Sequence, residues 1–198
     1  MIEAVEIAAP DGAVLRGELR RAGPVWVVLA HAPGEDLDAW APLPAALAAH
    51  GFAVLAFDLR GHGGSGGVVD AGRGAGDLGA AVEFARAEGA ERVVVGAAGE
   101  SVVPALAAAA EHGASGFVAV GPRGNELPRV AGFPRLVLAA SRDPEQDSAA
   151  TAFGRSGQAV VIRLPVSDVL RDAWRTNAEA YVLRFLDDVV RREAAATR

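Results

Sequence analysis

Six short, uninterrupted apolar runs constrain the fold of this chain more than any other feature. They cover residues 24–30, 52–58, 92–97, 116–120, 135–140 and 159–165. Continuous apolar runs of this length are typical of strands that are covered on both faces, as in a parallel sheet. The sequence therefore predicts six buried parallel strands.

Helical segments separate these runs. We expect helices over residues 39–50, 77–89, 101–112, 145–155 and 168–193, the second of them capped by Asp77. Ahead of the first run, residues 2–9 and 14–21 alternate around a Pro-Asp-Gly turn, as the strands of an antiparallel hairpin do. The pattern predicts an α/β fold: a mostly parallel sheet with an N-terminal antiparallel hairpin and helices on both faces.

Composition narrows the class of protein. The 198 residues are 51% hydrophobic and 22% charged, as in globular proteins, and no linker interrupts them, so we expect one domain over residues 1–198. The net charge of −6, without a run of lysine or arginine, argues against a nucleic-acid partner. The absence of cysteine excludes disulfides and thiolate catalysis.

The first residues and the alanine-rich segments bear on localisation. In MIEAVEIAAPDG, acidic residues interrupt the apolar ones, which is unlike a signal peptide. Proline, glycine or glutamate breaks the longest alanine-rich runs well short of a membrane span. We therefore expect a soluble, cytoplasmic protein that does not bind membranes, and the sequence leaves its oligomeric state open.

Four landmarks follow one another in an informative order. HAPG (31–34) comes after the first buried run, and FDLRGHGGSGG (57–67) ends the second. VVVGAAG (93–99) leads from a run into a helix, and LVLAASRDPEQD (136–147) leads from a run into an acidic loop. In this order they resemble the α/β-hydrolase superfamily, in its small forms without a cap domain such as dienelactone-hydrolase-like proteins and esterases. The resemblance implies an eight-stranded sheet.

The resemblance also implies where a catalytic set would lie. It places an oxyanion and ligand-binding region at His31, Ala32, Pro33, Gly99 and Glu100. It places the nucleophile elbow, the sharp strand-to-helix turn that carries the reactive residue, near residue 98, and the acid at Asp143. A catalytic histidine would follow the last strand, where Asp168 stands instead.

Two alignments of the elbow are open. In the first, which we favour, Gly96 stands two residues before the nucleophile position and Ala98 occupies it. In the second, Gly99-Glu100-Ser101 makes Ser101 the nucleophile, with Pro104 early in the helix. An alanine cannot attack a carbonyl, and Ser101 also suits a structural role that bonds backbone N–H groups at the helix start.

The positions of the histidines bear on catalysis whichever alignment of the elbow is correct. All four, at positions 31, 50, 62 and 112, precede Asp143, and none occurs after residue 112. An aspartate at 168 cannot replace the base at neutral pH unless its pKa is strongly raised. We expect His31 and His62 to anchor their loops, and His50 and His112, each before a glycine, to cap helices.

Other readings of the polar residues are weaker. Glu100, Asp143 and Asp168 could gather around a hard cation, but their spacing matches no metal loop, so we expect no metal. The lone G-x-x-G of GAAGES lies in the middle of the chain, so we expect no dinucleotide or other cofactor. Asp143, before Pro144, is also well placed as a turn residue.

The sequence predicts a hydrolase-like protein without Ser–His catalysis. Such a protein would bind a small molecule or a partner in the crevice at the carboxyl ends of the strands. The alternative is a hydrolase of unusual mechanism that uses Ser101 or the crevice carboxylates.

Overall fold

A computed structural model of the chain describes residues 1–124, 132–172 and 177–196. Eight strands form one sheet in the order β1-β2-β4-β3-β5-β6-β7-β8. The first two strands pair antiparallel, β2 pairs antiparallel with β4, and all other neighbours are parallel. The strands are β1 (Glu3–Ala8), β2 (Val14–Arg20), β3 (Val25–Ala30), β4 (Ala53–Phe57), β5 (Arg92–Ala98), β6 (Gly116–Val120), β7 (Arg135–Ala140) and β8 (Ala159–Leu164).

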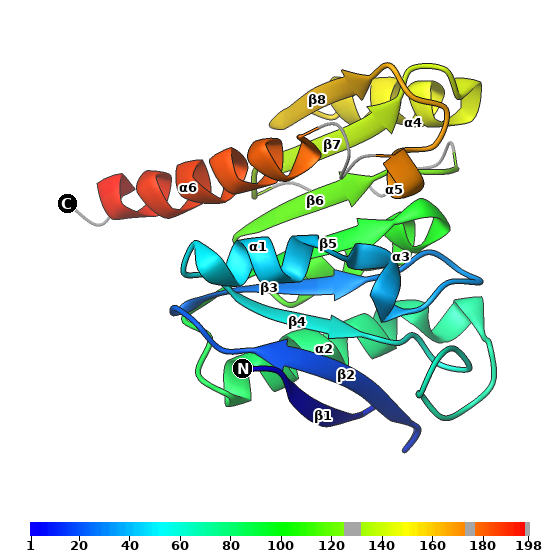
Figure 1. The fold of residues 1–198 in the computed structure, drawn as a ribbon, viewed down its shortest axis with the longest axis vertical. Helices are drawn as coiled ribbons and strands as arrows, with labels where there is room; N and C mark the ends of the chain where they lie inside the picture. Colours follow the sequence, from blue (N-terminus) through cyan, green and yellow to red (C-terminus); the bar gives the residue numbers. More distant parts are fainter. Residues whose placement is uncertain (125–131, 173–176, 197–198) are drawn as a thin grey trace.

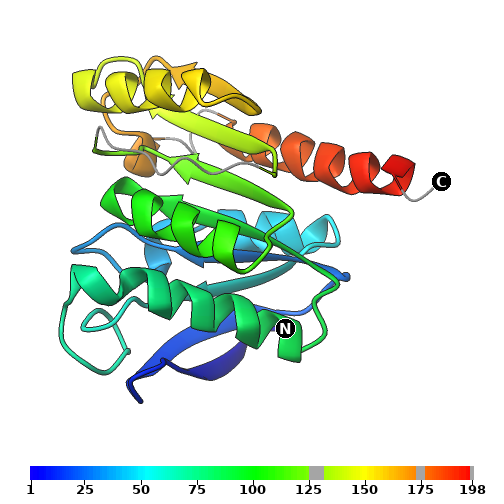
Figure 2. The same cartoon turned by 180° about the vertical axis from the view of Figure 1, so that it is seen from behind.

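Helices cover both faces of this sheet. They are α1 (Leu43–Ala49), α2 (Gly74–Ala87), α3 (Val102–Glu111), α4 (Pro144–Arg155), α5 (Val169–Asp172) and α6 (Ala178–Ala196), with 3-10 turns η1 (Leu37–Trp40), η2 (Ala71–Arg73) and η3 (Gly99–Ser101). Figure 1 shows α1 and α6 on one face, and Figure 2, from behind, shows α2, α3 and α4 on the other. The predicted α/β fold, with its hairpin and its helices on both faces, is confirmed.

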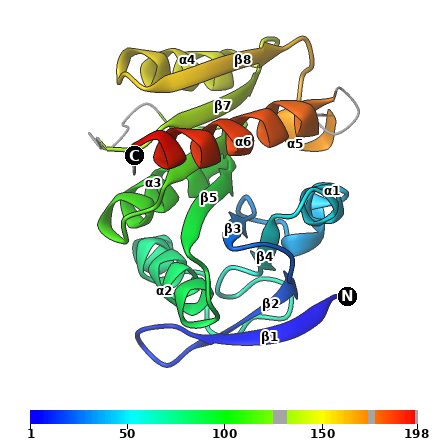
Figure 3. The same cartoon turned by 90° about the vertical axis from the view of Figure 1, so that its left-hand side faces the viewer.

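The core lies in two layers, one on each side of the sheet. One cluster joins the sheet to α2, α3 and α4, with Phe57, Leu106 and Phe153 fully buried. The other joins it to α1, α5 and α6 around Trp40, Leu47 and Leu186. Figure 3 shows the sheet between the two helical layers. Strands β3 to β7 are buried along nearly their whole length, as their uninterrupted apolar sequences predict.

Three helix predictions need correction. The segment 39–50 is divided into η1 and α1 at Pro42, which has no N–H to continue the first turn. The helix expected at 77–89 begins at Gly74, so Asp77 lies inside its first turn and does not cap it. The helix expected at 168–193 comprises α5 and α6, while residues 173–176 between them lie outside the described part of the chain.

Candidate functional site

The turn between β5 and α3 shows where the backbone bends. Ala98 is still extended, with φ −122° and ψ 147°, and it pairs with Val120 of β6. Its methyl group is fully buried in the core on the α1 and α6 face. Gly99 follows with φ +57°, the left-handed conformation that glycine adopts without strain. Because β5 is one residue longer than predicted, the sharp turn lies at Gly99 rather than at Ala98.

Little room remains for a side chain at this turn. A Cβ atom on Gly99 would lie 3.0 Å from the Cβ of Ala32, in the loop after β3. Ala32 is itself 7% exposed and packs in the core, so it has little freedom to move away. Glycine at 99 therefore satisfies both the backbone angle and the close approach of this loop.

Ser101 lies at the start of α3. Its side chain makes no hydrogen bond that caps the helix, so the structural role expected for it is not observed. The residue is 4% exposed, and it lines a cavity together with the exposed Glu100. Ser101 thus faces the crevice, but its backbone is helical and does not form the sharp turn.

This cavity lies at the carboxyl ends of β3, β4 and β5. Its volume is about 420 Å³, within the range of small-molecule sites. Loops after the three strands and the first turns of α2 and α3 form its wall, which is mostly apolar. The lining residues are Pro33, Leu59, Arg60, His62, Val69, Asp70, Ala71, Gly74, Asp77, Leu78, Glu100, Ser101, Val103, Pro104 and Ala107.

His31 joins the loop after β3 to the loop after β4. The ring is fully buried; its Nδ1 lies 2.8 Å from the carbonyl oxygen of Ala32, and its Nε2 accepts a hydrogen bond of 2.9 Å from the N–H of Leu59. Burial lowers the pKa of His31. An accepting Nε2 leaves the proton on Nδ1, so the ring is neutral and both nitrogens are occupied. The structure confirms the anchoring role.

His62 makes a second link between the same loops. Its Nδ1 lies 2.9 Å from the carbonyl oxygen of Arg60, and its Nε2 accepts from the N–H of Gly34 at 3.1 Å. The two imidazole rings meet edge to face, 5.2 Å apart. His62 lines the cavity, but its nitrogens are held by the backbone as those of His31 are.

The other two histidines lie at the ends of helices. His50 ends α1, with Nδ1 2.9 Å from the carbonyl oxygen of Ala46. His112 ends α3 and contacts Glu83 of α2 at 2.9 Å. Both positions agree with the capping roles expected from the sequence.

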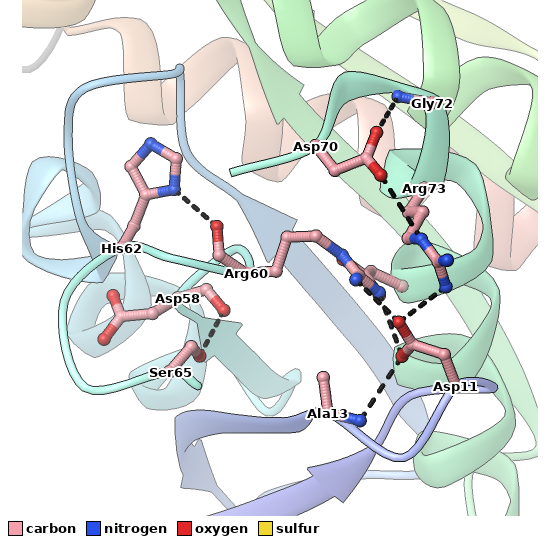
Figure 4. A network of polar contacts seen from close by, with 10 residues as sticks. Asp11, Ala13, Asp58, Arg60, His62, Ser65, Asp70, Gly72 and Arg73 are labelled. Carbon is pink, nitrogen blue, oxygen red and sulfur yellow. Dashed lines mark hydrogen bonds and ion pairs between the residues drawn. The ribbon is translucent and has the colours of Figure 1, made fainter. Parts of the chain in front are cut away.

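The segment after β4 is organised by Asp58 and Ser65. The two Asp58 oxygens accept from the N–H groups of Leu37 and Gly64, at 2.8 and 2.7 Å. The hydroxyl of Ser65 donates to the Asp58 carbonyl at 2.6 Å and accepts from the N–H of Arg16 at 2.8 Å. These bonds, seen in part in Figure 4, hold the glycine-rich loop that forms one wall of the cavity.

Arg60 is the centre of an ionic network that is buried on one side, at Asp77, and exposed on the other. It forms an ion pair of two hydrogen bonds with Asp77 of α2. Its guanidinium also lies 2.9 Å from Asp11 of the first hairpin, and Asp11 in turn pairs with Arg73 at 2.6 Å (Figure 4). The side chains of Arg60 and Asp77 are 6% and 1% exposed. The hydrogen bond from Arg60 is the largest influence that lowers the pKa of Asp11, to about 2. The network ties three elements together at the wall of the cavity, which Arg60 and Asp77 both line.

Asp143 acts as a helix cap. One of its oxygens accepts from the N–H groups of Glu145 and Gln146, and the other lies 2.9 Å from the guanidinium of Arg123. Although partial burial raises the pKa of Asp143, the backbone hydrogen bonds and the charge of Arg123 together lower it. Its carboxylate is therefore occupied by the helix and by an arginine.

Asp168 directly precedes α5, and its carbonyl accepts from the N–H of Asp172 at 3.0 Å. Neither Asp143 nor Asp168 lines the cavity that contains Glu100. Across residues 1–124, 132–172 and 177–196, no three histidine, aspartate or glutamate side chains gather in a way that could hold a metal ion. The carboxylate cluster considered from the sequence is not observed among them.

The structure brings together only part of the predicted site. Pro33, Glu100 and Ser101 line one cavity, while His31, Ala32 and Gly99 lie beside it without lining it. Sequence reasoning missed the pairing of Arg60 with Asp77. The Asp-x-Arg-Gly sequence indicates the family resemblance, but it does not indicate which acidic residues pair with the arginine.

The sheet order, the elbow after β5 and the crevice above it define an α/β-hydrolase fold without a cap domain. Residues 25–173 match the family model described as serine aminopeptidase, S33. The chain belongs to this family of α/β hydrolases. In the described part of the chain, no helix is long and apolar enough to cross a membrane.

Similar solved structures agree on the fold. An esterase from Pyrococcus furiosus superposes with a TM-score of 0.82 at 18% identity, over 96% of this chain and 91% of that one. An α/β serine hydrolase without a lid from Xanthomonas campestris gives 0.81 at 20% identity, over 96% and 94%. A thermophilic esterase from Thermogutta terrifontis gives 0.78 at 16%, over 94% and 99%. No curated protein matches the sequence.

Proposed function

We propose that this chain has kept the α/β-hydrolase scaffold without Ser–His catalysis, and that it binds a small apolar molecule in the cavity beside Gly99. The observation that carries the proposal is the elbow itself. Its left-handed residue is a glycine, and Ala32 crowds the space that a nucleophilic side chain would need. Acyl transfer requires a nucleophile at such a turn.

The histidines support the same conclusion. Proton transfer from a serine needs an imidazole nitrogen that is free to accept a proton. His31 and His62 are the histidines of the two loops beside the cavity, and all four of their nitrogens contact backbone atoms. No histidine occurs after residue 112 to supply a base from the loop after β8.

The cavity supports binding by size and chemistry. A volume of about 420 Å³ suits a molecule the size of a small metabolite or drug fragment. Leu59, Leu78, Val103 and Pro104 supply apolar surface, while Ser101 offers a hydroxyl for orientation. We therefore expect a mostly apolar ligand that forms one or two hydrogen bonds near the start of α3.

A neutral apolar fluorophore, N-phenyl-1-naphthylamine, tests binding directly. The wild type should enhance its fluorescence saturably, and Ala107→Phe should weaken binding at least about tenfold because the larger side chain fills the cavity. Ala87→Phe, on an exposed position at the far end of α2, is the matched control and should bind as the wild type does. Equal binding by both variants would reject this cavity as the site.

One observation favours a second function, hydrolysis by Ser101. The serine lines the same cavity, and its side chain does not cap α3. This hypothesis predicts that Ser101→Ala abolishes turnover of an ester. Because Ser101→Ala leaves the elbow and the cavity wall intact, unchanged turnover would exclude the serine.

A further inference from the structure

The two edges of the sheet differ in how they are protected. At one edge, β1 carries Glu3 and Glu6, which pair with Arg21 and Arg16 at 2.9 and 3.0 Å. Charges of this kind discourage the edge from pairing with another chain. At the other edge, shown in Figure 1, β8 has the sequence AVVIRL, with a single charged residue. Val160 in this strand is 55% exposed.

The backbone of β8 has a regular set of outward groups. The carbonyls of Gln158 and Leu164 accept hydrogen bonds from the β7 side. Because the direction of backbone bonding alternates along a strand in a parallel pair, Ala159, Val161 and Arg163 direct their N–H and C=O groups away from β7. In the described part of the chain, β7 is the only strand that pairs with β8.

The face of β8 towards α6 is also incompletely covered. Two grooves of about 200 and 260 Å³ run between β8 and α6, and Val160 lines both. Ile162, on the same face, is only partly buried, whereas Val161 packs on the opposite face with the core below α4. Exposed apolar side chains and unpaired backbone groups thus occur on the same strand.

We propose that β8 is a self-association surface, on which a second copy of this chain adds its own β8 antiparallel across a two-fold axis at Val161. In that register the outward N–H and C=O of Val161 pair with those of the second Val161, and Ala159 pairs with Arg163 of the other copy. Every outward group of the strand finds a partner. The match arises because the outward residues are symmetric about position 161.

Side chains fit the same register. Val160 of one copy lies opposite Ile162 of the other on the incompletely covered face, which buries both apolar side chains. Arg184 and Asp188, both exposed, line the neighbouring groove one helical turn apart. A second copy therefore complements this surface in hydrogen bonding and apolar contact.

Analytical ultracentrifugation over a concentration series tests self-association. The wild type should form a dimer, and Val160→Lys should weaken it at least about tenfold, because the charge occurs twice in the interface. Val14→Lys makes the same change in β2, next to the edge strand at the other side of the sheet, on a residue that is 38% exposed, and should dimerise as the wild type does. A monomeric wild type, including one whose edge takes up an extended peptide instead, would overturn the proposal.

Cysteine crosslinking tests the register, because the native chain contains no cysteine. Cα atoms of a directly opposed pair without hydrogen bonds lie about 4.5 Å apart, close enough for a disulfide. Mixing Val160→Cys with Ile162→Cys should give a crosslinked heterodimer. Either variant alone should crosslink poorly, because its two cysteines are diagonal neighbours about 7–8 Å apart. A dimer that crosslinks equally well in the single variants contradicts the register.

Discussion

At the scale of single residues, the turn after β5 is constrained in two ways. The φ of Gly99 is +57°. A Cβ atom added to this residue would also lie only 3.0 Å from the Cβ of Ala32. The two constraints have different physical origins, since one is torsional and the other is packing. They can therefore be measured separately.

Gly99→Ala should lower the free energy of unfolding by about 2–4 kcal/mol, from the left-handed backbone and the contact with Ala32 together. Gly34→Ala, at φ +84° with nothing within 4 Å of an added Cβ, should cost only about 1–2 kcal/mol. Urea unfolding measures both. Adding Ala32→Gly should recover part of the loss in Gly99→Ala alone; additivity in this double-mutant cycle would show that the contact has no energetic effect.

His31 makes stability depend on pH. Burial lowers its pKa below the ordinary 6.5, so below about pH 6.5 the unfolded chain binds a proton that the folded chain does not. The free energy of unfolding should therefore fall as the pH drops from 6.5 towards the lowered pKa. Above pH 6.5, the full contribution of His31 to stability should be present.

Unfolding in urea across this pH window checks the expectation. His31→Gln should be less stable overall and should show a smaller dependence on pH. Val27→Ala, at a fully buried position, loses stability without removing a titratable group and should keep the slope of the wild type. A slope in His31→Gln equal to that of the wild type would assign the dependence to other groups.

At the scale of elements, Arg60 connects the first hairpin, the loop after β4 and α2. Arg60→Ala should destabilise the fold by about 3–5 kcal/mol, because it leaves the carboxylate of Asp77 buried without its partner. Arg73→Ala, with a side chain 52% exposed, should cost less than about 1 kcal/mol. Replacing Arg60 by Met together with Asp77 by Leu should recover much of the loss. A cost below 1 kcal/mol for Arg60→Ala would show that Asp77 is solvated or repacked.

The order of elements was predictable because each buried strand has its own uninterrupted apolar run. Boundaries were less predictable where local and tertiary effects compete. β5 continues to Ala98 because β6 offers Val120 as a partner, which nothing in the sequence of β5 indicates. Asp77 looked like a cap because capping is a local preference, but its actual partner, Arg60, lies in another segment.

At the scale of the whole molecule, the sequence reveals some features of the candidate site and leaves others to the structure. The missing histidine after residue 112 is visible in the sequence alone. The cavity is not, because its wall depends on how the glycine-rich loop folds against α2 and α3. Likewise, a motif with two glycines, Gly96 and Gly99, leaves the turn ambiguous until the backbone angles are known.

Hydrolysis of p-nitrophenyl acetate by the wild type, beside Ser101→Ala, tests the central claim most directly. Under the proposal, the elbow lacks a nucleophile and the imidazoles beside the cavity are engaged by the backbone. The wild type should therefore hydrolyse the ester no faster than background, and the variant should behave identically. Turnover well above background in the wild type that disappears in Ser101→Ala would contradict the claim and identify the chain as a hydrolase.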